Sequence, residues 1–401
     1  MNHMDAPRPN ADQPRFTGYY READCKTDDL FALLARETVA RDVPHACDIV
    51  KNVPVYSGDM LRELQGDPQG RTAVMAQWAR VMMKGAGVLV IAGAYDDVAV
   101  IDAATSEYAG IIADEKAANG TAADHFAAAG ANDRIWNSLQ KLCLRAPDVF
   151  ARYFGNPLID MVCEAWLGPN YQMTAQVNLV RPGGQAQQVH RDYHLGFQTV
   201  DECEKYPAHV HHLSPVLTLQ GAVAHCDMPV ESGPTLLLPF SQNYAEGYLA
   251  WRRQDFRDLF NARHIQLPLK KGDALFFNPA LFHAAGTNFS ADIQRMANLL
   301  QVSSAYGRAM EAIDRLAMCK VLYPVLKQEM QKGALTQSQL DAAIAACAEG
   351  YAFPTNLDTD PPIGGLAPET QNRLFHRALA ENMTDAQFEN ALISQQTRQK
   401  P

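Results

Sequence analysis

The chain has 401 residues, of which 47% are hydrophobic and 20% are charged, and its formal net charge is −10. This composition is typical of a folded globular protein and excludes a largely disordered chain. Because the balance is acidic and no apolar run reaches the roughly 18 residues that span a membrane, we expect a cytoplasmic protein that binds neither nucleic acid nor membranes.

Helical periodicity dominates the first part of the chain. A continuous apolar run at 87–93 indicates one short buried strand. Apolar residues recur at helical spacing in four other segments, at 28–41, 72–85, 95–118 and 147–168. We therefore predict a helical N-terminal extension over residues 1–80 and a core domain that begins at residue 81.

The pattern changes after Pro169 to short runs rich in Val, Leu, Thr and Phe, which are separated by Gly, Pro and Asn. These runs lie at 171–184, 216–227, 234–241, 264–279 and 295–306. Short strands at such spacing predict antiparallel sheets and not βαβ units. We expect an α+β fold whose mainly β core, residues 81–305, is a cupin-like double-stranded β-helix, or jelly roll.

Helical periodicity then returns, and we predict a helical C-terminal extension over residues 306–401 that packs on the core. Two capping-box patterns mark helix starts, Thr336 with Gln339 and Thr384 with Gln387. The helical extensions also provide surface for a homodimer. The eight cysteines are scattered without a CxxC pair, so the sequence indicates neither a zinc ribbon nor a disulfide framework.

The stretch QQVHRDYH, residues 187–194, places ligand-type side chains in a predicted strand. Side chains alternate along a strand, so His190 and Asp192 point to the same side and Arg191 points to the other. An imidazole and a carboxylate held side by side provide two of three protein ligands for a metal ion. The alternative is a His–Asp hydrogen bond on a solvated edge, which an isolated HxD triplet does not exclude.

A third ligand and a carboxylate-binding group follow later in the core. His283 lies just past the apolar run 274–277, from which a second strand would deliver it to the same end of the barrel. Two histidines and one carboxylate form the facial triad of non-haem Fe(II) oxygenases. Arg295 starts the next apolar run, and its planar guanidinium can bind a carboxylate through two hydrogen bonds. An arginine at this place suits a dicarboxylic co-substrate.

Three segments, QVHRDYH, ESGPTLLLPFS and FHAAGTNFSADIQRMANLL, together resemble the landmark segments of the phytanoyl-CoA dioxygenase family of Fe(II)/2-oxoglutarate oxygenases. The resemblance extends over residues 81–305. It implies that His190, Asp192 and His283 bind the iron. It also implies that Arg295 binds the distal carboxylate of 2-oxoglutarate and that O2 is the second co-substrate.

The middle segment departs from the family pattern, which usually reads Asn-Gly-x-Leu followed by Pro-Gly-Ser-His. Phe240 and Gln242 stand where the family has the glycine and the histidine. His283 is followed by two alanines where the family usually has small or hydroxyl residues. Thr287 and Ser290 are therefore the candidates for a hydroxyl that binds the co-substrate.

Two other histidine-containing segments compete for a metal. A second HxD triplet, His225-Cys226-Asp227, also ends a predicted strand. The family pattern places its aspartate in a turn before the middle segment, so we favour the first triplet as the metal site. The cluster HVHHL at 209–213 has no Cys or carboxylate at zinc-ligand spacing, and we interpret it as a loop or a substrate-facing segment.

We therefore expect a non-haem iron, 2-oxoglutarate-dependent dioxygenase that hydroxylates or otherwise oxidises a C–H bond of a small-molecule metabolite, with release of succinate and CO2. The polar segment 201–215 is the candidate substrate-covering loop, and His194, His209 and His211 are candidate substrate contacts. The alternative is a cupin-like metal-binding isomerase or sensor without oxygenase turnover. Such a protein has no need for the carboxylate-binding Arg295.

Overall fold

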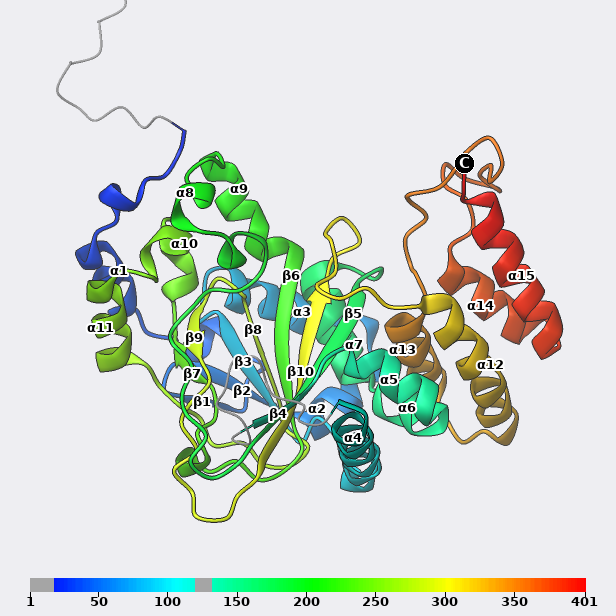
Figure 1. Ribbon diagram of the computed structural model, residues 1–401, viewed down its shortest axis with the longest axis horizontal. Coiled ribbons are helices and arrows are strands. Elements are labelled where there is room, and N and C mark those ends of the chain that lie inside the picture. Colours follow the sequence, from blue (N-terminus) through cyan, green and yellow to red (C-terminus); the bar gives the residue numbers. More distant parts are fainter. Residues whose placement is uncertain (1–17, 120–131) are drawn as a thin grey trace, which may run out of the picture.

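A large, mainly antiparallel sheet forms the centre of the molecule, and we call it the main sheet (Figure 1). The computed structural model describes residues 18–119 and 132–401. In spatial order, the strands of the main sheet are β1 (Asp48–Val50), β2 (Val53–Ser57), β3 (Val88–Ala92), β8 (Ala274–Phe277), β6 (Thr218–Ala224), β10 (Arg295–Ser303), β5 (Gln172–Val180) and β4 (Asn132–Ile135). Neighbouring strands run antiparallel, except that β2 and β3 are parallel.

The N-terminal part of the chain differs from the expected helical extension. Strands β1 and β2 lie before residue 80, yet they form one edge of the main sheet, and β2 pairs with β3. The prediction of a helical extension over residues 1–80 is therefore wrong for these two strands. Strands this short contain too few alternations for the hydrophobic pattern of the sequence to reveal them.

Helices pack around the sheets (Figure 1). Before β5 they are α1 (Thr27–Leu34), α2 (Gly58–Glu63), α3 (Pro68–Met83), α4 (Val98–Asn119), α5 (Ser138–Arg145), α6 (Pro147–Tyr153) and α7 (Pro157–Leu167). Between β5 and β8 they are α8 (Val200–Cys203), α9 (Ala208–Leu213), α10 (Gly247–Ala250) and α11 (Gln254–Arg263). The last four are α12 (Arg315–Lys332), α13 (Gln337–Cys347), α14 (Gln371–Ala380) and α15 (Asp385–Arg398).

Of the C-terminal helices, α12 packs against α5 and α6 and α13 packs against α6 and α7, on the opposite side of the molecule from α1 and α11 (Figure 1). Both predicted capping boxes are formed, at the first turns of α13 and α15. None of the helices in the described ranges combines the length and the apolar content that crossing a membrane requires.

A second, small sheet lies against one face of the main sheet. It consists of the antiparallel strands β7 (Leu236–Leu238) and β9 (Phe282–Ala284). Two extended segments join it through single bridges, one between His190 and His283 and one between Leu237 and Ile265. The small sheet therefore places the segment that carries His190 directly beside the strand that carries His283.

Side-chain alternation gives the main sheet two different faces. Leu219 and Val223 of β6 point outward into the largest apolar core, to which α3 to α7 contribute. Leu275 and Phe277 of β8 point inward into a second core, which they share with Leu237 of the small sheet. Inward-facing polar side chains of the main sheet are thus enclosed between the two sheets.

Candidate metal centre

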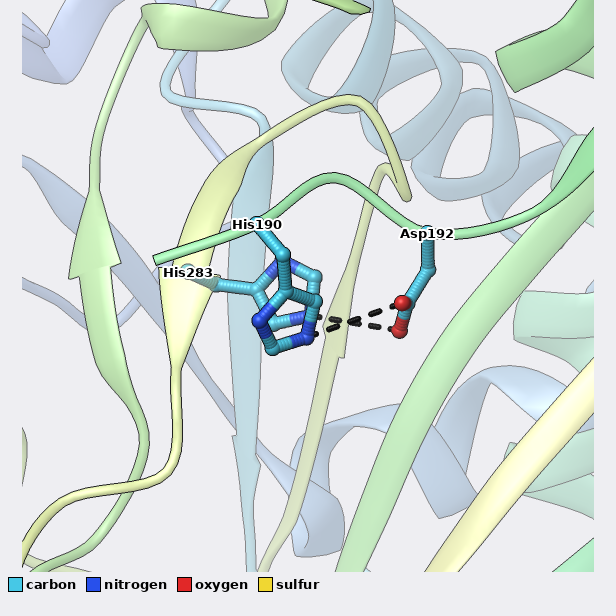
Figure 2. A group of neighbouring side chains, drawn as sticks. All are labelled: His190, Asp192 and His283. Carbon is cyan, nitrogen blue, oxygen red and sulfur yellow. Dashed lines mark ion pairs between the residues drawn. The ribbon is translucent and has the colours of Figure 1, made fainter. Parts of the chain in front are cut away.

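Three side chains from two segments converge between the two sheets (Figure 2). His190 Nε2 lies 3.6 Å from Asp192 Oδ1, and His283 Nε2 lies 3.4 Å from Asp192 Oδ2. One ligand atom from each residue lies within 4.8 Å of the others. In the described part of the chain, no other group of three His, Cys, Asp or Glu side chains comes this close together. These are the three residues that the sequence singled out.

The hydrogen bonds of the two imidazoles determine which nitrogen faces Asp192. His190 Nδ1 lies 2.8 Å from the carbonyl oxygen of Gln188, and His283 Nδ1 lies 2.9 Å from that of Leu281. Because a carbonyl oxygen only accepts, both Nδ1 atoms carry the proton and both Nε2 atoms present lone pairs. Lone pairs that face a carboxylate repel it unless a cation lies between them. The donor set therefore fits a divalent metal ion.

Backbone pairing holds the two histidines side by side. The His190 N–H donates to the carbonyl oxygen of His283 at 3.0 Å, and the His283 N–H donates to that of His190 at 3.2 Å. The Asp192 N–H donates to Pro279 at 3.1 Å. Apart from this bridge, the HxD segment is extended chain and not the regular strand that the sequence predicted. Alternation over three residues is nevertheless enough to direct His190 and Asp192 to one side.

Burial and neighbouring groups set the protonation of the site. Burial lowers the pKa of His190, which favours the neutral imidazole that metal binding requires. Burial would raise the pKa of Asp192, but in the metal-free site attraction to His190 in its protonated form and the hydrogen bond from Gln220 outweigh burial, and the net pKa is lowered. The carboxylate is therefore charged at neutral pH, and the site presents the negative charge that a metal cation needs.

A chain of buried polar side chains orients the Asp192 carboxylate. Gln220 Nε2 donates to Asp192 Oδ2, and it also lies 3.4 Å from Gln301 Oε1. Gln301 Oε1 in turn accepts a hydrogen bond of 2.6 Å from the hydroxyl of Tyr193. Gln220 and Gln301 are paired in register on β6 and β10. Neither residue is among those predicted from the sequence, although a glutamine inside an apolar strand run is a visible signal of a buried polar role.

A cavity of about 510 Å³ opens beside the triad. The three triad residues line it together with Arg295, and apolar side chains such as Phe277 and Leu299 form part of the wall. Further polar groups of the lining are Gln176, Asn178, Gln187, Gln188, Gln220, Gln301 and Arg134. The metal-ligand set and the predicted carboxylate-binding arginine therefore line the same cavity.

Arg295 is buried at the edge of this cavity, with 7% of its surface exposed. Its Nη1 donates to the carbonyl oxygens of Ser232 and Gly286, both at 3.1 Å. Burial lowers the pKa of Arg295 to about 10, so the guanidinium stays charged at neutral pH. None of the carboxylates among residues 18–119 and 132–401 forms an ion pair with it. A buried guanidinium that the protein leaves without an anion favours an anionic ligand.

The two candidate hydroxyls for the co-substrate have other partners. Thr287 Oγ1 accepts the backbone N–H of Ala186 at 2.9 Å. Ser290 Oγ donates to Asn288 Oδ1 at 2.6 Å and accepts the Ile293 N–H at 3.3 Å. Neither Thr287 nor Ser290 lines the cavity. Both stabilise the loop between β9 and β10, and the structure does not bring them to the triad.

The three candidate substrate histidines also lie outside the cavity lining. His194 Nδ1 lies 3.2 Å from Ser214 Oγ. His209 is exposed on α9, whereas His211 is buried on the same helix with Nε2 3.1 Å from the carbonyl oxygen of Cys203. The expected polar loop at 201–215 contains the helices α8 and α9, and none of its residues lines the cavity.

The position where the family has glycine is left-handed in this chain. Phe240 has φ 71°, which glycine adopts freely but which strains a phenylalanine. Its N–H donates to the carbonyl oxygen of Ala86 at 3.0 Å, and its ring is buried between the sheets. Gln242, which replaces the family histidine, donates to the carbonyl oxygen of Gly85 at 2.9 Å. Both residues therefore bind the loop after β7 to the segment before β3.

Comparison with known families identifies the chain. It belongs to the phytanoyl-CoA dioxygenase (PhyH) family, whose family model matches residues 83–297, more than half of the chain. This match confirms the resemblance seen in the three sequence segments. The family consists of non-haem iron enzymes that use Fe(II), 2-oxoglutarate and O2, and the His190, Asp192 and His283 cluster is compatible with that metal.

Individual relatives are distant. Dioxygenase andF from Emericella variicolor is 25% identical over 144 residues, which are 35% of this chain and 45% of that protein. The chain therefore spans less than half of this relative. The non-haem α-ketoglutarate-dependent epimerase SnoN from nogalamycin biosynthesis is 20% identical with a TM-score of 0.39, over 60% of this chain and 84% of SnoN. EvdMO1 is 16% identical with a TM-score of 0.40, over 58% of this chain and 50% of EvdMO1.

Proposed function

We propose that this protein is an Fe(II)/2-oxoglutarate-dependent dioxygenase that oxidises a C–H bond of a small-molecule metabolite. The observation that supports it most directly is the shared cavity of the His190, Asp192 and His283 cluster and Arg295. A metal-binding isomerase or sensor would use the three ligands alone. A co-substrate that carries a carboxylate would give the Arg295 guanidinium an anion, which the described part of the protein does not provide.

We also infer that the two sheets form a double-stranded β-helix. The small sheet and its two bridged segments provide one layer, and the central antiparallel strands of the main sheet provide the other. The core of Val90, Leu275 and Leu237 fills one part of the space between the layers, and the cavity occupies another. This arrangement supports a jelly-roll barrel with the metal centre inside one end.

Each group in the cavity has a distinct task under this proposal. The Nε2 atoms of His190 and His283 and the carboxylate of Asp192 would hold the metal. Arg295 would bind the distal carboxylate of 2-oxoglutarate, and its two hydrogen bonds to backbone carbonyls fix the orientation of the guanidinium. The apolar part of the wall excludes water, which strengthens these charge interactions.

The chemistry that the metal supplies when bound is the oxidative decarboxylation of 2-oxoglutarate by O2 to succinate and CO2, coupled to oxidation of the substrate. The protein contributes binding and orientation. The volume of the cavity beside the triad, about 510 Å³, is in the range of small-molecule sites, and this supports a metabolite as the substrate.

Turnover of 2-oxoglutarate tests this function without knowledge of the substrate. We expect the purified protein to form succinate slowly from 2-oxoglutarate when Fe(II), ascorbate and O2 are supplied. His283→Ala should abolish this formation, and Asp227→Ala in the second HxD triplet is the matched control that should retain it. Metal-loaded wild-type protein that forms no succinate above the His283→Ala background would contradict the proposal.

A further inference from the structure

Arg191, the middle residue of the HxD triplet, is a buried cation without a carboxylate partner in the described structure. It is 2% exposed and belongs to the largest fully buried side chains. A guanidinium is charged at neutral pH. Burying a charge costs free energy unless favourable contacts compensate for it. The contacts of the guanidinium indicate which part of the structure its position stabilises.

The Arg191 guanidinium connects the two segments that carry the metal ligands. Its carbon Cζ lies 5.0 Å from the centre of the Phe282 ring, and Phe282 directly precedes His283. Its Nη2 donates to the carbonyl oxygen of Ser241 at 2.6 Å, and the hydroxyl of the same serine accepts the Phe282 N–H at 2.8 Å. Arg191, Ser241 and Phe282 thus form a closed ring of contacts.

Further contacts fix the guanidinium in place. Nη2 also donates to the carbonyl oxygen of Tyr244 at 2.9 Å, and Cζ lies 5.1 Å from the centre of the Tyr248 ring. Gly247 leaves space for it, because a Cβ at that position would lie 1.9 Å from Arg191 Cζ. The planar group is therefore held between two aromatic rings and hydrogen bonds, a geometry that a lysine ammonium cannot reproduce.

From this arrangement we infer that Arg191 is a positioning residue, which sets the spacing between the HxD segment and His283 and thereby the metal affinity of the site. The inference rests on the proposed function, since it requires that the triad binds a metal. Residues that orient metal ligands typically change the affinity on the order of ten- to hundredfold when they are replaced. The backbone bridge between His190 and His283 alone would leave the side-chain spacing less restrained.

Metal affinity and stability must be measured separately to test this role. We would titrate Mn(II) and Co(II) into the full-length protein below its unfolding temperature and record the unfolding midpoint of the metal-free protein. The variants are Arg191→Met, Arg191→Lys and Gly247→Ala, whose added Cβ displaces the guanidinium. The matched control is Arg252→Met, because Arg252 also donates to backbone carbonyls, those of Gly196 and Gln198, and also packs on an aromatic ring.

We expect Arg191→Met to weaken metal binding about ten- to hundredfold, Arg191→Lys and Gly247→Ala to weaken it by an intermediate factor, and Arg252→Met to stay within about twofold of wild type. If Arg191→Met fails to fold, Arg191→Lys and Gly247→Ala still test the inference. Folded Arg191 variants that bind metal within about twofold of wild type would overturn the inference while leaving the proposed function intact. Wild-type protein that binds no metal would overturn both.

Discussion

Two HxD triplets in this chain lie in different environments. His190 and Asp192 face the cavity between the sheets, where both converge on His283. In the second triplet, Ala224 of β6 lines the cavity, so the next residue, His225, points to the opposite face of the main sheet. Along this strand, one residue therefore faces the cavity and the next faces the apolar core on the other side of the main sheet.

Both ring nitrogens of His225 in the second triplet have hydrogen-bond partners. His225 Nδ1 lies 2.8 Å from Thr105 Oγ1, and His225 Nε2 lies 2.8 Å from the hydroxyl of Tyr153. Because Thr105 donates its own proton to the carbonyl of Ile101, Nδ1 is the donor and Nε2 the acceptor of the neutral ring. Asp227 accepts the backbone N–H of Lys271 at 3.0 Å, as a turn residue would.

The comparison shows that the triplet itself does not make a metal site. In both triplets Nδ1 donates to an oxygen, but only in the first does Nε2 face a carboxylate and a second imidazole. In the second, Nε2 is used by a tyrosine hydroxyl. The two imidazoles differ in whether they point into the cavity or to the other face of the main sheet, and in whether Nε2 already has a hydrogen-bond partner.

The largest expected difference is in metal binding. Asp192→Ala removes a ligand, and we expect metal affinity to fall by more than about a hundredfold, since even residues that only orient ligands change it ten- to hundredfold. Asp227→Ala should leave the metal affinity within about twofold of the wild-type value. Equilibrium dialysis against Fe(II) under anaerobic conditions measures both. Equal losses in the two variants would remove the distinction between the triplets.

The next effect concerns Arg295, which shares the cavity with the first triplet only. Arg295→Met removes the charge that would pair with 2-oxoglutarate, and losing one partner of a buried ion pair costs about 2–5 kcal/mol. We therefore expect the half-saturating 2-oxoglutarate concentration to rise by roughly two orders of magnitude, with unchanged metal affinity. Arg295→Lys should give a smaller rise because the charge is kept. An unchanged half-saturation in the methionine variant would exclude this role.

A pH effect of intermediate size is expected from the second triplet. Burial lowers the pKa of His225 to about 3, whereas an unfolded histidine titrates near about 6.5. Between these two pKa values the unfolded chain binds a proton that the folded chain does not. The contribution of His225 to the free energy of unfolding is therefore fully present above about pH 6.5 and declines as the pH falls below that value. At about pH 5 the loss amounts to about 2 kcal/mol.

Denaturant unfolding across this pH range measures the effect of His225. In His225→Gln, which keeps a donor and an acceptor but does not titrate, the free energy of unfolding should decline less steeply on acidification than in the wild type. All other groups are the same in the two proteins, so their contributions cancel in the comparison. Parallel curves for the two proteins would show that His225 is not held neutral by its surroundings.

The smallest effects are expected at the loop between β9 and β10. Thr287→Val removes the hydrogen bond that Ala186 donates to the loop, Ser290→Ala removes hydrogen bonds within the loop, and we expect each to lower the free energy of unfolding by about 1 kcal/mol. Half-saturation by 2-oxoglutarate should stay within about twofold in steady-state assays, because neither side chain lines the cavity. A larger rise for either variant would restore that residue as a co-substrate contact.

The parts of the site that sequence patterns predicted depend on local geometry. Alternation over His190, Arg191 and Asp192 needs only three extended residues, and it holds although the segment is outside regular strands. Arg295 begins β10, which follows β9 in the chain but belongs to the main sheet, and it lines the same cavity as His283. For these residues the pattern in the sequence and the position in space are directly linked.

Other expectations failed where the local conformation was misjudged. His209 and His211 share one face only in a strand, and Pro207 instead precedes the short helix α9, which exposes one and buries the other. The roles of Gln220 and Arg191 depend on partners far away in the sequence, Asp192 and Ser241. No pattern within a single segment contains those contacts, so only the folded chain reveals them.

The most direct measurement is anaerobic absorption spectroscopy of the protein with Fe(II) during a titration with 2-oxoglutarate. If the His190, Asp192 and His283 cluster holds iron and Arg295 holds the co-substrate beside it, a weak visible charge-transfer band should appear and saturate. The band should be absent in Asp192→Ala and unchanged in Asp227→Ala. Iron-loaded wild-type protein without any band on addition of 2-oxoglutarate would contradict the central claim that this cavity binds both.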